Sequence, residues 1–548
     1  MSSVKFLKKW LFAATLFFVF LFFVMVGAKV SLAKKGISKS CIVCSKIPAV
    51  SFGSSTKKGD VEIYFVDKKG LKTATKNFGD VLKNKVDFEK FEAKSGQKTT
   101  LGYINDKKVV VIGVEKDTDN EKSNKKIDVT NFQYEKLGAG IVGLLPEGKE
   151  VSVALHGEYA EGLKGDKLDD LLVSAYFGFA QRYYSFDKYF TSKDFLEKKS
   201  TVKSVLIDVK QNDYNKKLLK EVQAKLEGIY FVRDMANEPA NVVYPESFVE
   251  EVKRVFAGVK NVKVNVMNLS ELKKKNMNLL LGVAQGSAKE PKVVVVEYHG
   301  DPKSKGMELA LIGKGVTFDS GGLSLKPSPH MEGMKCDMTG SATVIGTILA
   351  LAKEGAKVNA VAVGGMVENM PGSHAQKVGD IVRSMSGKTV EIIDTDAEGR
   401  LVLADVLYYA QTTYKPKYMI DVATLTGAIM VALGQNRAGI FSNSDELGKK
   451  LQEIGEKTGD RNWFMPLDSE HTELIKSNVA DLRNLGKVRW AGSATAAAFL
   501  QEFIDDNKNW AHVDMAGVDL ATGENPFAVA DTAFGYGVKM LTEFAKSL

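Results

Sequence analysis

The stretch DTDAEGRLVL, residues 394–403, places three carboxylates and one arginine within seven positions. These residues are Asp394, Asp396, Glu398 and Arg400. An acidic cluster of this kind is most often a solvated loop without a chemical role. A cation-binding role becomes the stronger interpretation if other segments supply more groups of the same kind.

Two further segments supply such groups. GKGVTFDSGGLSLKP carries Lys314, Asp319 and Lys326, and MKCDMTGSAT carries Asp337. With Asp396 and Glu398 the segments provide four carboxylates, which could share one pocket only if cations lay among them, and two divalent ions would balance the four charges. None of the six histidines lies in these segments, and only His330 lies between the first two, so a histidine-rich zinc site is not available. Oxygen-rich coordination favours manganese or magnesium and tolerates zinc.

Alternating strand-like and helical segments surround these groups. The strand-like runs are KVVVVEYHG, MELALIGKG, VNAVAVGG, TVEIIDTD and KYMIDVATLTG, with helical patterns such as SATVIGTILALAKEG between several of them. This alternation predicts an open, mostly parallel sheet with helices on both faces and a ligand site beyond the carboxyl ends of the strands. Lys314, Asp319 and Lys326 follow the run MELALIG, and Asp396 and Glu398 follow VEII, so they fall at those predicted ends.

The chain before residue 206 reads as a smaller α/β unit. The runs VEIYFV, KKVVVIGV and VSVALHG alternate with lysine-rich turns and with helical stretches such as LDDLLVSAYFGFAQRYYSF. We therefore predict an α/β protein with a smaller N-terminal α/β domain at residues 51–205. A larger catalytic α/β domain with a central, mostly parallel sheet follows at residues 206–548. GAGIVG, residues 138–143, has G-x-G-x-x-G spacing, but it follows a helix-like stretch and precedes a strand, so we interpret it as a helix end with small residues for packing.

Residues 1–50 form a basic tail with a hydrophobic segment. They contain eight lysines and no acidic residue, so they carry the whole net charge of +8, and residues 51–548 sum to zero. The apolar run Trp10–Ala28 behind a lysine-bearing start is typical of a secretory signal or membrane anchor. An upstream extension from a misassigned start codon is the alternative, and in either case we exclude the tail from the fold.

The three cysteines indicate no disulfide framework. Cys41 and Cys44 form one C-x-x-C without a second pair for zinc, and Cys336 is a single thiol. The body of the chain therefore fits a reducing compartment.

Four motifs, in this order and spacing, resemble those of the leucyl aminopeptidases, the two-metal cytosol aminopeptidases. They are GKGVTFDSGG, MKCDMTGSA, DTDAEGRLVLADVL and DVATLTGA. The resemblance runs from about Arg233 to the C-terminus and is looser before residue 200. It implies a metal-dependent aminopeptidase, a hydrolase that releases N-terminal amino acids, preferably leucine-like, from short peptides by means of a water activated by two metal ions. The implied cofactors are two divalent ions per subunit, manganese or zinc.

The resemblance also implies roles for individual residues. The implied metal ligands are Lys314, Asp319, Asp337, Asp396 and Glu398. Asp319 and Glu398 would bridge the two ions. Lys314 can coordinate only as a neutral amine, so the cations must depress its pKa.

Two cationic residues would act on the reaction itself. By the same resemblance, Lys326 would stabilise the tetrahedral intermediate electrostatically. Arg400 would hold a bicarbonate ion that shuttles a proton, a role that suits a planar guanidinium. The first substrate subsite would be an apolar pocket lined by Met334, Thr424, Leu425 and Gly427.

Assembly and location are implied in the same way. The family forms hexamers in the cytoplasm, so we expect a cytoplasmic homohexamer; export or membrane anchoring through residues 10–28, if they are retained, is the alternative. Some bacterial relatives bind DNA, which makes a DNA-binding architectural assembly the alternative function. The zero net charge of residues 51–548 argues against nucleic acid as a partner.

Position 394 departs from the family pattern, which begins this motif with Asn. An ionised Asp394 accepts hydrogen bonds but cannot donate as an amide does. We expect it to remain ionised near Lys326 or Arg400 and to tighten metal retention.

Overall fold

The computed structural model describes residues 42–43, 45–53, 59–115 and 130–548. The chain divides into two units between Cys44 and Ser45, and the elements described below belong to the second, the compact unit Ser45–Leu548. The apolar segment Trp10–Ala28 and the pair Cys41 and Cys44, singled out in the sequence, lie outside the described residues. Within the part of the chain that is described, no helix combines the length and apolar character needed to cross a membrane.

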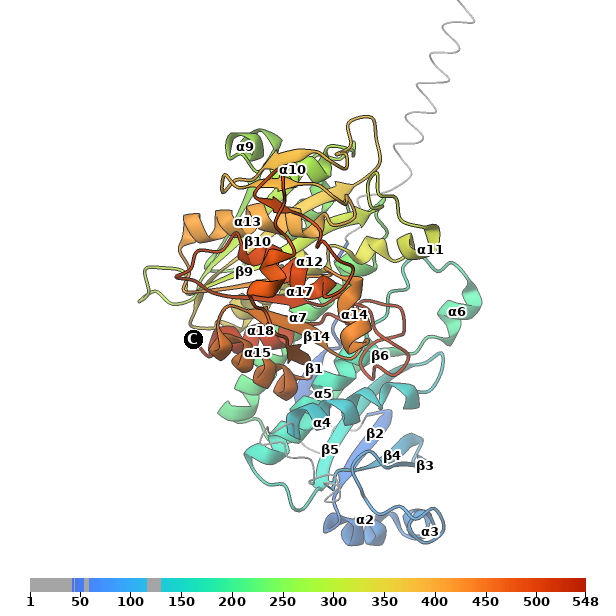
Figure 1. The fold of residues 1–548 in the computed structure, drawn as a ribbon. Helices are drawn as coiled ribbons and strands as arrows, with labels where there is room; N and C mark the ends of the chain where they lie inside the picture. Colours follow the sequence, from blue (N-terminus) through green and yellow to red (C-terminus); the bar gives the residue numbers. More distant parts are fainter. Residues whose placement is uncertain (1–41, 44, 54–58, 116–129) are drawn as a thin grey trace, which may run out of the picture. The chain divides into compact units, whose positions relative to one another are not determined.

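A six-stranded sheet forms the N-terminal part of the second unit (Figure 1). Its order is β1-β6-β5-β2-β4-β3, and neighbouring strands are parallel except β3 and β4. The strands are β1 (Val50–Phe52), β2 (Val61–Val66), β3 (Lys98–Ile104), β4 (Lys107–Gly113), β5 (Glu150–Tyr159) and β6 (Thr201–Asp208). The runs VEIYFV, KKVVVIGV and VSVALHG form β2, β4 and β5, as predicted. Strands buried on both faces read as continuous apolar runs, which is why the sequence reveals them.

Two helices of this part pack unusually closely. The helices of this part are α2 (Gly70–Phe78), α3 (Asp80–Phe88), α4 (Thr130–Ala139), α5 (Asp166–Tyr183) and α6 (Lys193–Lys198). A Cβ on Gly138 of α4 would lie 1.8 Å from the main-chain oxygen of Ala175 in α5. The first glycine of GAGIVG therefore lies at a helix end and permits helix packing, which confirms that interpretation.

An eight-stranded sheet forms the centre of the C-terminal part. Its order is β15-β14-β17-β13-β9-β10-β8-β7. The four strands from β17 to β10 are parallel, and antiparallel pairs occur at β14–β17, β10–β8 and β8–β7. The strands are β7 (Val262–Met267), β8 (Lys292–His299), β9 (Leu309–Asp319), β10 (Asn359–Asn369), β13 (Tyr418–Ala423), β14 (Ala438–Ser442), β15 (Asn462–Phe464) and β17 (Asn509–Asp514). The predicted fold class, α/β with a mostly parallel central sheet, is confirmed.

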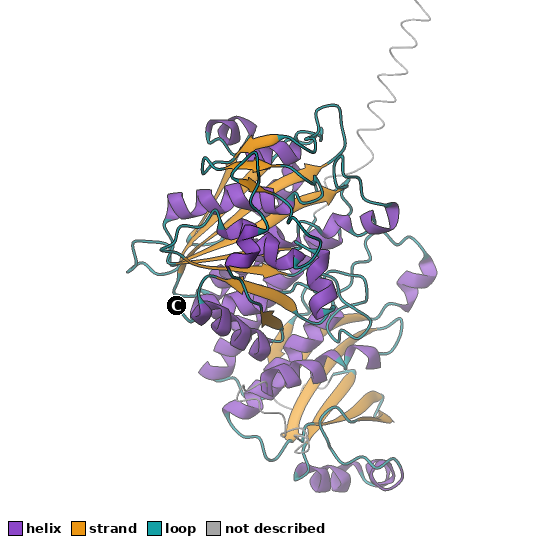
Figure 2. Ribbon diagram, in the orientation of Figure 1, coloured by secondary structure: helices purple, strands orange, loops and turns teal. Residues whose placement is uncertain are grey.

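Helices cover both faces of this sheet (Figure 2). On one face α12 (Thr339–Glu354) packs between the central strands and the helices α7 (Asp213–Asn237) and α18 (Val538–Lys546). On the other, α13 (Gly399–Tyr414) packs on β9 and contacts α10 and α17. The main apolar core lies between α13 and the sheet. The remaining helices are α8 (Pro245–Phe256), α9 (Leu269–Lys274), α10 (Asn278–Ala284), α11 (Ser328–Met331), α14 (Gly427–Leu433), α15 (Asp445–Thr458), α16 (Ser469–Glu473) and α17 (Gly492–Gln501).

Two strand predictions were wrong in detail. Within TVEIIDTD only β12 (Thr389–Glu391) is extended, and it pairs with β11 (Ile381–Arg383) and β16 (Leu482–Arg483) in a separate three-stranded sheet. This strand buries one face only, which does not suit a position between two helical layers. The second error concerns β9, which continues to Asp319 through β-branched and aromatic residues, so Lys314 lies inside the strand rather than after it.

The predicted boundary between residues 205 and 206 falls inside β6. This strand ends at Asp208 and α7 begins at Asp213. Because α5 packs against α7 within one compact unit, the division into an N-terminal and a catalytic domain stays a prediction.

A buried histidine links three strands of the small sheet. His156 on β5 has its Nδ1 atom 2.6 Å from Asp208 Oδ2 on β6, and its Nε2 atom hydrogen-bonds Glu62 Oε2 on β2. The ring stacks on Tyr64, with 4.5 Å between ring centroids. Burial lowers the pKa of His156, but the hydrogen bonds and charges of the two carboxylates raise it by more, so the net shift is upward.

This pairing predicts a pH-dependent contribution to stability. Since the folded-state pKa of His156 is raised, its contribution is fully present below the unfolded value of about 6.5 and is lost as pH rises through the folded value. His156→Gln should lower the free energy of unfolding by on the order of 3 kcal/mol at pH 6, because it removes the positive charge that lies between Glu62 and Asp208, and by less at pH 9. Urea denaturation at both pH values measures the difference. An equal loss at both would show that the histidine is not protonated in the fold.

Candidate active site

The end of β9 positions the first carboxylate. Asp319 Oδ1 accepts hydrogen bonds from Gly321 N at 2.9 Å and from Asn369 Nδ2, at the end of β10, at 2.8 Å. Gly321 and Gly322 adopt φ angles of 85° and 66°, which side-chain-bearing residues rarely adopt. The two glycines therefore let the chain turn sharply after β9 while the Asp319 carboxylate stays fixed.

The loop before α13 supplies two more carboxylates, Asp396 and Glu398. Asn369 Nδ2 also donates to Thr395 O at 3.0 Å, and Thr395 Oγ1 donates to Gly321 O at 2.6 Å, so this loop is joined to the ends of β9 and β10. Glu398 immediately precedes the first residue of α13. The positive end of the helix dipole favours a carboxylate there.

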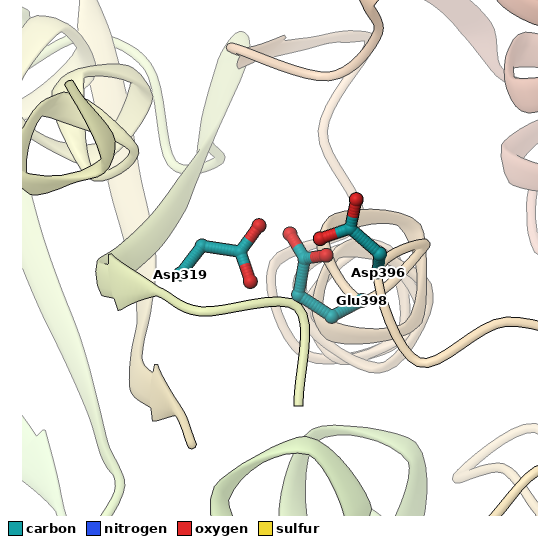
Figure 3. Close-up of side chains that lie close together, drawn as sticks. All are labelled: Asp319, Asp396 and Glu398. Atoms are coloured by element: carbon teal, nitrogen blue, oxygen red, sulfur yellow. The ribbon is translucent and has the colours of Figure 1, made fainter. Parts of the chain in front are cut away.

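The three carboxylates converge. Asp319, Asp396 and Glu398 each offer an oxygen, and these oxygens all lie within 4.8 Å of one another. Figure 3 shows the three side chains, from the end of a strand and from the start of a helix, pointing toward one another. A cluster of this geometry is suited to binding a cation.

Lys314 lies buried among the carboxylates. Its Nζ atom is 2.8 Å from Asp337 Oδ1 and 2.9 Å from Glu398 Oε1, and it donates to Thr424 O at 2.9 Å. A Cβ at Gly399 would lie 2.8 Å from the same nitrogen, so the glycine leaves room for the lysine side chain. Burial lowers the pKa of Lys314, but the surrounding carboxylates raise it by more.

Lys326 approaches the cluster from the loop after β9. Its Nζ atom lies 2.9 Å from Asp319 Oδ2 and 2.5 Å from Asp396 Oδ1. The sequence placed Lys314 and Lys326 near the acidic residues, and the structure brings them into direct contact with those residues.

The acidic groups are strongly perturbed. Burial raises the pKa of Glu398 to about 7 and that of Asp396 to about 6, and the charge of Asp319 adds to both shifts. Burial, with the charges of Glu398 and Asp319, also raises the pKa of Asp337 well above its usual range. Such shifts are typical of functional sites.

These residues line one cavity of about 790 Å³. Among the described residues that form its wall are six carboxyl groups and two lysines. The carboxyl groups belong to Asp319, Asp337, Asp394, Asp396, Glu398 and Asp519. If all six were ionised, their six negative charges would exceed the two lysine charges by four, which is unfavourable unless cations bind.

The fit to divalent cations rests on two further atoms. Asp337 Oδ2 and Glu398 Oε2 are buried, and neither accepts a hydrogen bond from the described part of the chain. Buried carboxylate oxygens without donors are costly, and metal coordination would satisfy them. The donor set, carboxylates with one amine, therefore fits two divalent ions.

Most of the remaining sequence-predicted residues reach the cavity. Its wall includes Met334, Thr424, Leu425 and Gly427. Thr424 Oγ1 also donates to Asp337 Oδ1 at 2.8 Å, which joins the predicted substrate pocket to the acidic cluster.

Arg400 does not belong to the described residues that line the cavity. It lies buried in the first turn of α13, its Nη1 atom donates to Asn484 O at 2.8 Å, and its Nε atom has no acceptor in the described part of the chain. Burial lowers its pKa to about 10. Contact with the cavity therefore does not account for the predicted role of Arg400 in holding bicarbonate.

Asp394 lies in the cavity wall, and its charge acts on Arg400, one of the two cationic residues expected near it. Its Oδ1 atom accepts the main-chain N–H of Asp396 at 2.9 Å. Lys326 pairs with Asp319 and Asp396 rather than with Asp394, because the turn directs the Asp394 carboxylate toward the main chain.

Sequence reasoning missed several residues of the wall. These are Cys336, Met430, Ala516 and Asp519. Cys336 lies in MKCDMTGSA, one of the four motifs given by the sequence, and the other three lie outside those motifs. Their position depends on turns that spacing alone does not define.

Comparison with known proteins identifies the family. The model described as "Cytosol aminopeptidase family, catalytic domain" matches residues 230–542. The chain belongs to this family. A probable cytosol aminopeptidase of Brucella ovis is 39% identical over 514 residues, which cover 92% of this chain and 99% of that protein.

Solved structures agree with this assignment. A mutant of tomato leucine aminopeptidase is similar with a TM-score of 0.77 and 28% identity, covering 91% of this chain and 97% of that chain. The bottromycin maturation enzyme BotP in complex with Mn is similar with a TM-score of 0.74 and 28% identity, covering 89% and 99%. The predicted resemblance is thus confirmed, and the chain is a cytosol aminopeptidase, a metallo-exopeptidase.

The perturbed groups predict that metal binding releases protons. At pH 7, Mn²⁺ binding at this cluster should release at least one proton per chain, because a protonated carboxyl group or ammonium group of the cluster would have to lose its proton before it could coordinate. Since the two carboxyl pKa values are raised, apparent affinity should fall as pH falls from 7.5 to 5.5. Calorimetric titrations in buffers of different ionisation enthalpy count the protons. Identical heats in both buffers, together with pH-independent affinity, would contradict this.

Proposed function

We propose that this aminopeptidase holds two divalent cations through Lys314, Asp319, Asp337, Asp396 and Glu398. The observation that carries the proposal is the convergence of Asp319, Asp396 and Glu398 within 4.8 Å in a wall whose carboxyl groups outnumber its lysines. Manganese or zinc is the proposed metal, and the Mn complex of BotP supports manganese. When bound, the two cations would supply a nucleophilic water near neutral pH, a ligand position for the substrate's free amine and polarisation of the scissile carbonyl.

Lys326 is the proposed electrostatic catalyst. Its ammonium group lies at the carboxylate cluster, and burial with two carboxylates in contact holds it charged, since its pKa is raised overall. A fixed positive charge next to the scissile carbonyl would stabilise the negative charge that develops on its oxygen.

Arg400 is the proposed residue for bicarbonate. Its buried Nε–H has no acceptor in the described structure and so remains available to a planar anion. Its Nη1 bond to Asn484 would hold the guanidinium plane in place.

The proposed substrates are short peptides with a free N-terminus. Met334, Leu425 and Gly427 contribute an apolar part of the wall, which suits leucine-like first residues. The need for a free amine would make the enzyme an exopeptidase.

Assembly and location are the last two parts of the proposal. A homohexamer follows from the family resemblance, and exposed apolar side chains such as Val431 and Trp490, 90% and 68% accessible, would gain from being covered. A cytoplasmic location is supported by the relatives' name, cytosol aminopeptidase, and by the free thiol of Cys336.

Metal removal tests the chemistry. Chelation should abolish hydrolysis of a leucyl amide, and Mn²⁺ should restore it. The N-acetylated amide should remain uncut under all conditions, because its nitrogen can no longer act as a ligand. Cleavage of the blocked substrate at a comparable rate would rule out the proposed exopeptidase geometry.

Two substitutions test the cationic residues. Lys326→Ala should lower kcat by on the order of 100-fold with metal content unchanged, since loss of a donor to a tetrahedral intermediate costs about 3 kcal/mol. Arg400→Ala should cost less, because water or buffer can replace a proton shuttle. Lys335→Ala is the matched control, since its ammonium donates to Asn237 O and lies outside the described cavity wall. Steady-state kinetics gives kcat for each variant, and metal analysis gives its metal content. Metal loss in the first two variants would indicate a structural role instead.

A further inference from the structure

Asp519 is a carboxyl group of the cavity wall that the proposed mechanism does not use. It lies five residues after the end of β17, in the same wall as Met334, Cys336 and Ala516. Its charge contributes to the raised pKa of the Cys336 thiol, after burial, so the carboxyl group and the thiol are neighbours. Asp519 is not one of the three carboxylates that converge on the candidate metal position.

The main chain on both sides of Asp519 is well anchored. Met515 N donates to Ala423 O on β13 at 2.8 Å, and Val518 N donates to Met515 O at 2.9 Å. Asp519 O itself accepts from Phe534 N at 2.9 Å. The carboxyl group is therefore held at a defined point of the wall rather than on a loose loop.

The carboxyl group has no cationic partner of its own. In the described structure no lysine, arginine or histidine nitrogen lies within 4.0 Å of it. Lys314 acts on it from a distance, but that ammonium group is paired with Asp337 and Glu398. Burial raises the pKa of Asp519 to about 7, although hydrogen bonds from the main-chain N–H groups of Leu520 and Asp519 itself favour the charged form, so a cation close by would stabilise the carboxylate further.

The neighbouring wall fits the stem of a long side chain. Met334, Leu425 and Met430 present flexible apolar surface in the same cavity. A lysine or arginine side chain could lay its methylene groups along these residues and place its charge at Asp519. A leucine side chain would instead exclude water from the carboxyl group without supplying a cationic partner.

We propose that Asp519 is a specificity-determining residue that selects substrates whose first residue carries a cationic side chain, lysine or arginine. This inference rests on the proposed function, since it assumes that the first side chain enters this cavity. It extends the leucine-like preference with a charged contact that the apolar wall alone would not provide.

The test compares lysyl amide with norleucyl amide, which share a linear stem and differ in the terminal ammonium. For each enzyme, the ratio of the two kcat/KM values is measured, so that the amount of active protein cancels. In Asp519→Asn, which keeps the side-chain shape, this ratio should fall at least tenfold, because a charge-assisted contact is lost. Glu332→Gln is the control, because it removes an exposed acid close to the cavity, and its ratio should stay within twofold of wild type.

A second measurement does not depend on turnover. Calorimetry should show that free lysine binds the metal-loaded enzyme more tightly than free norleucine, and that Asp519→Asn removes this difference. An unchanged ratio and unchanged relative affinity in Asp519→Asn would overturn the inference. If the wild type cleaved no aminoacyl amide at all, the proposed function would fail instead, so the two failures are distinguishable.

Discussion

The burial of more carboxylate charge than nearby lysines neutralise is the constraint on which the rest of the site depends. Buried ionised groups are costly unless they are paired. In this fold the buried carboxylates lie at the carboxyl ends of parallel strands, where main-chain N–H groups and a helix N-terminus partly offset the free-energy cost of burying them. Asp319 lies at the end of β9 and Glu398 at the start of α13, so both are held by elements whose positions are set by the core.

The sequence was sufficient for most of this arrangement. Strands such as β9 and β10 are buried on both faces and therefore appear in the sequence as continuous apolar runs. The central strands could thus be predicted from the sequence without knowledge of which strands they pair with. The rule that ligand sites lie beyond parallel strand ends then brought Asp319 and Lys326 together correctly. Asp396 and Glu398 were correctly predicted to lie near the other acidic residues, but the predicted cause was incomplete. The strand before them, β12, belongs to a different sheet, and the start of α13 positions them instead.

The parts that could not be predicted depend on turns and on side-chain direction. Asp394 was expected near Lys326 or Arg400, and its charge does act on Arg400, but the hydrogen bond from Asp396 N–H to its Oδ1 atom depends on the turn before α13. Asp519 drew no notice in the sequence, because a single acid after a strand is usually solvated. Only the anchoring of the chain after β17 turns it into part of the cavity wall.

The amide side chain of Asn369 holds together the two segments that form this site. Asn369 donates through the same nitrogen to Asp319 and to Thr395 O, and so connects the two segments that carry the converging carboxylates. Asparagine amides are among the thermolabile groups of proteins. Hydrolysis of this amide would replace a shared donor by an oxygen that can only accept when ionised. Deamidation of this one side chain would thus replace two hydrogen bonds by repulsion from Asp319 Oδ1 and Thr395 O. Both segments would loosen together, without any change in the encoded sequence.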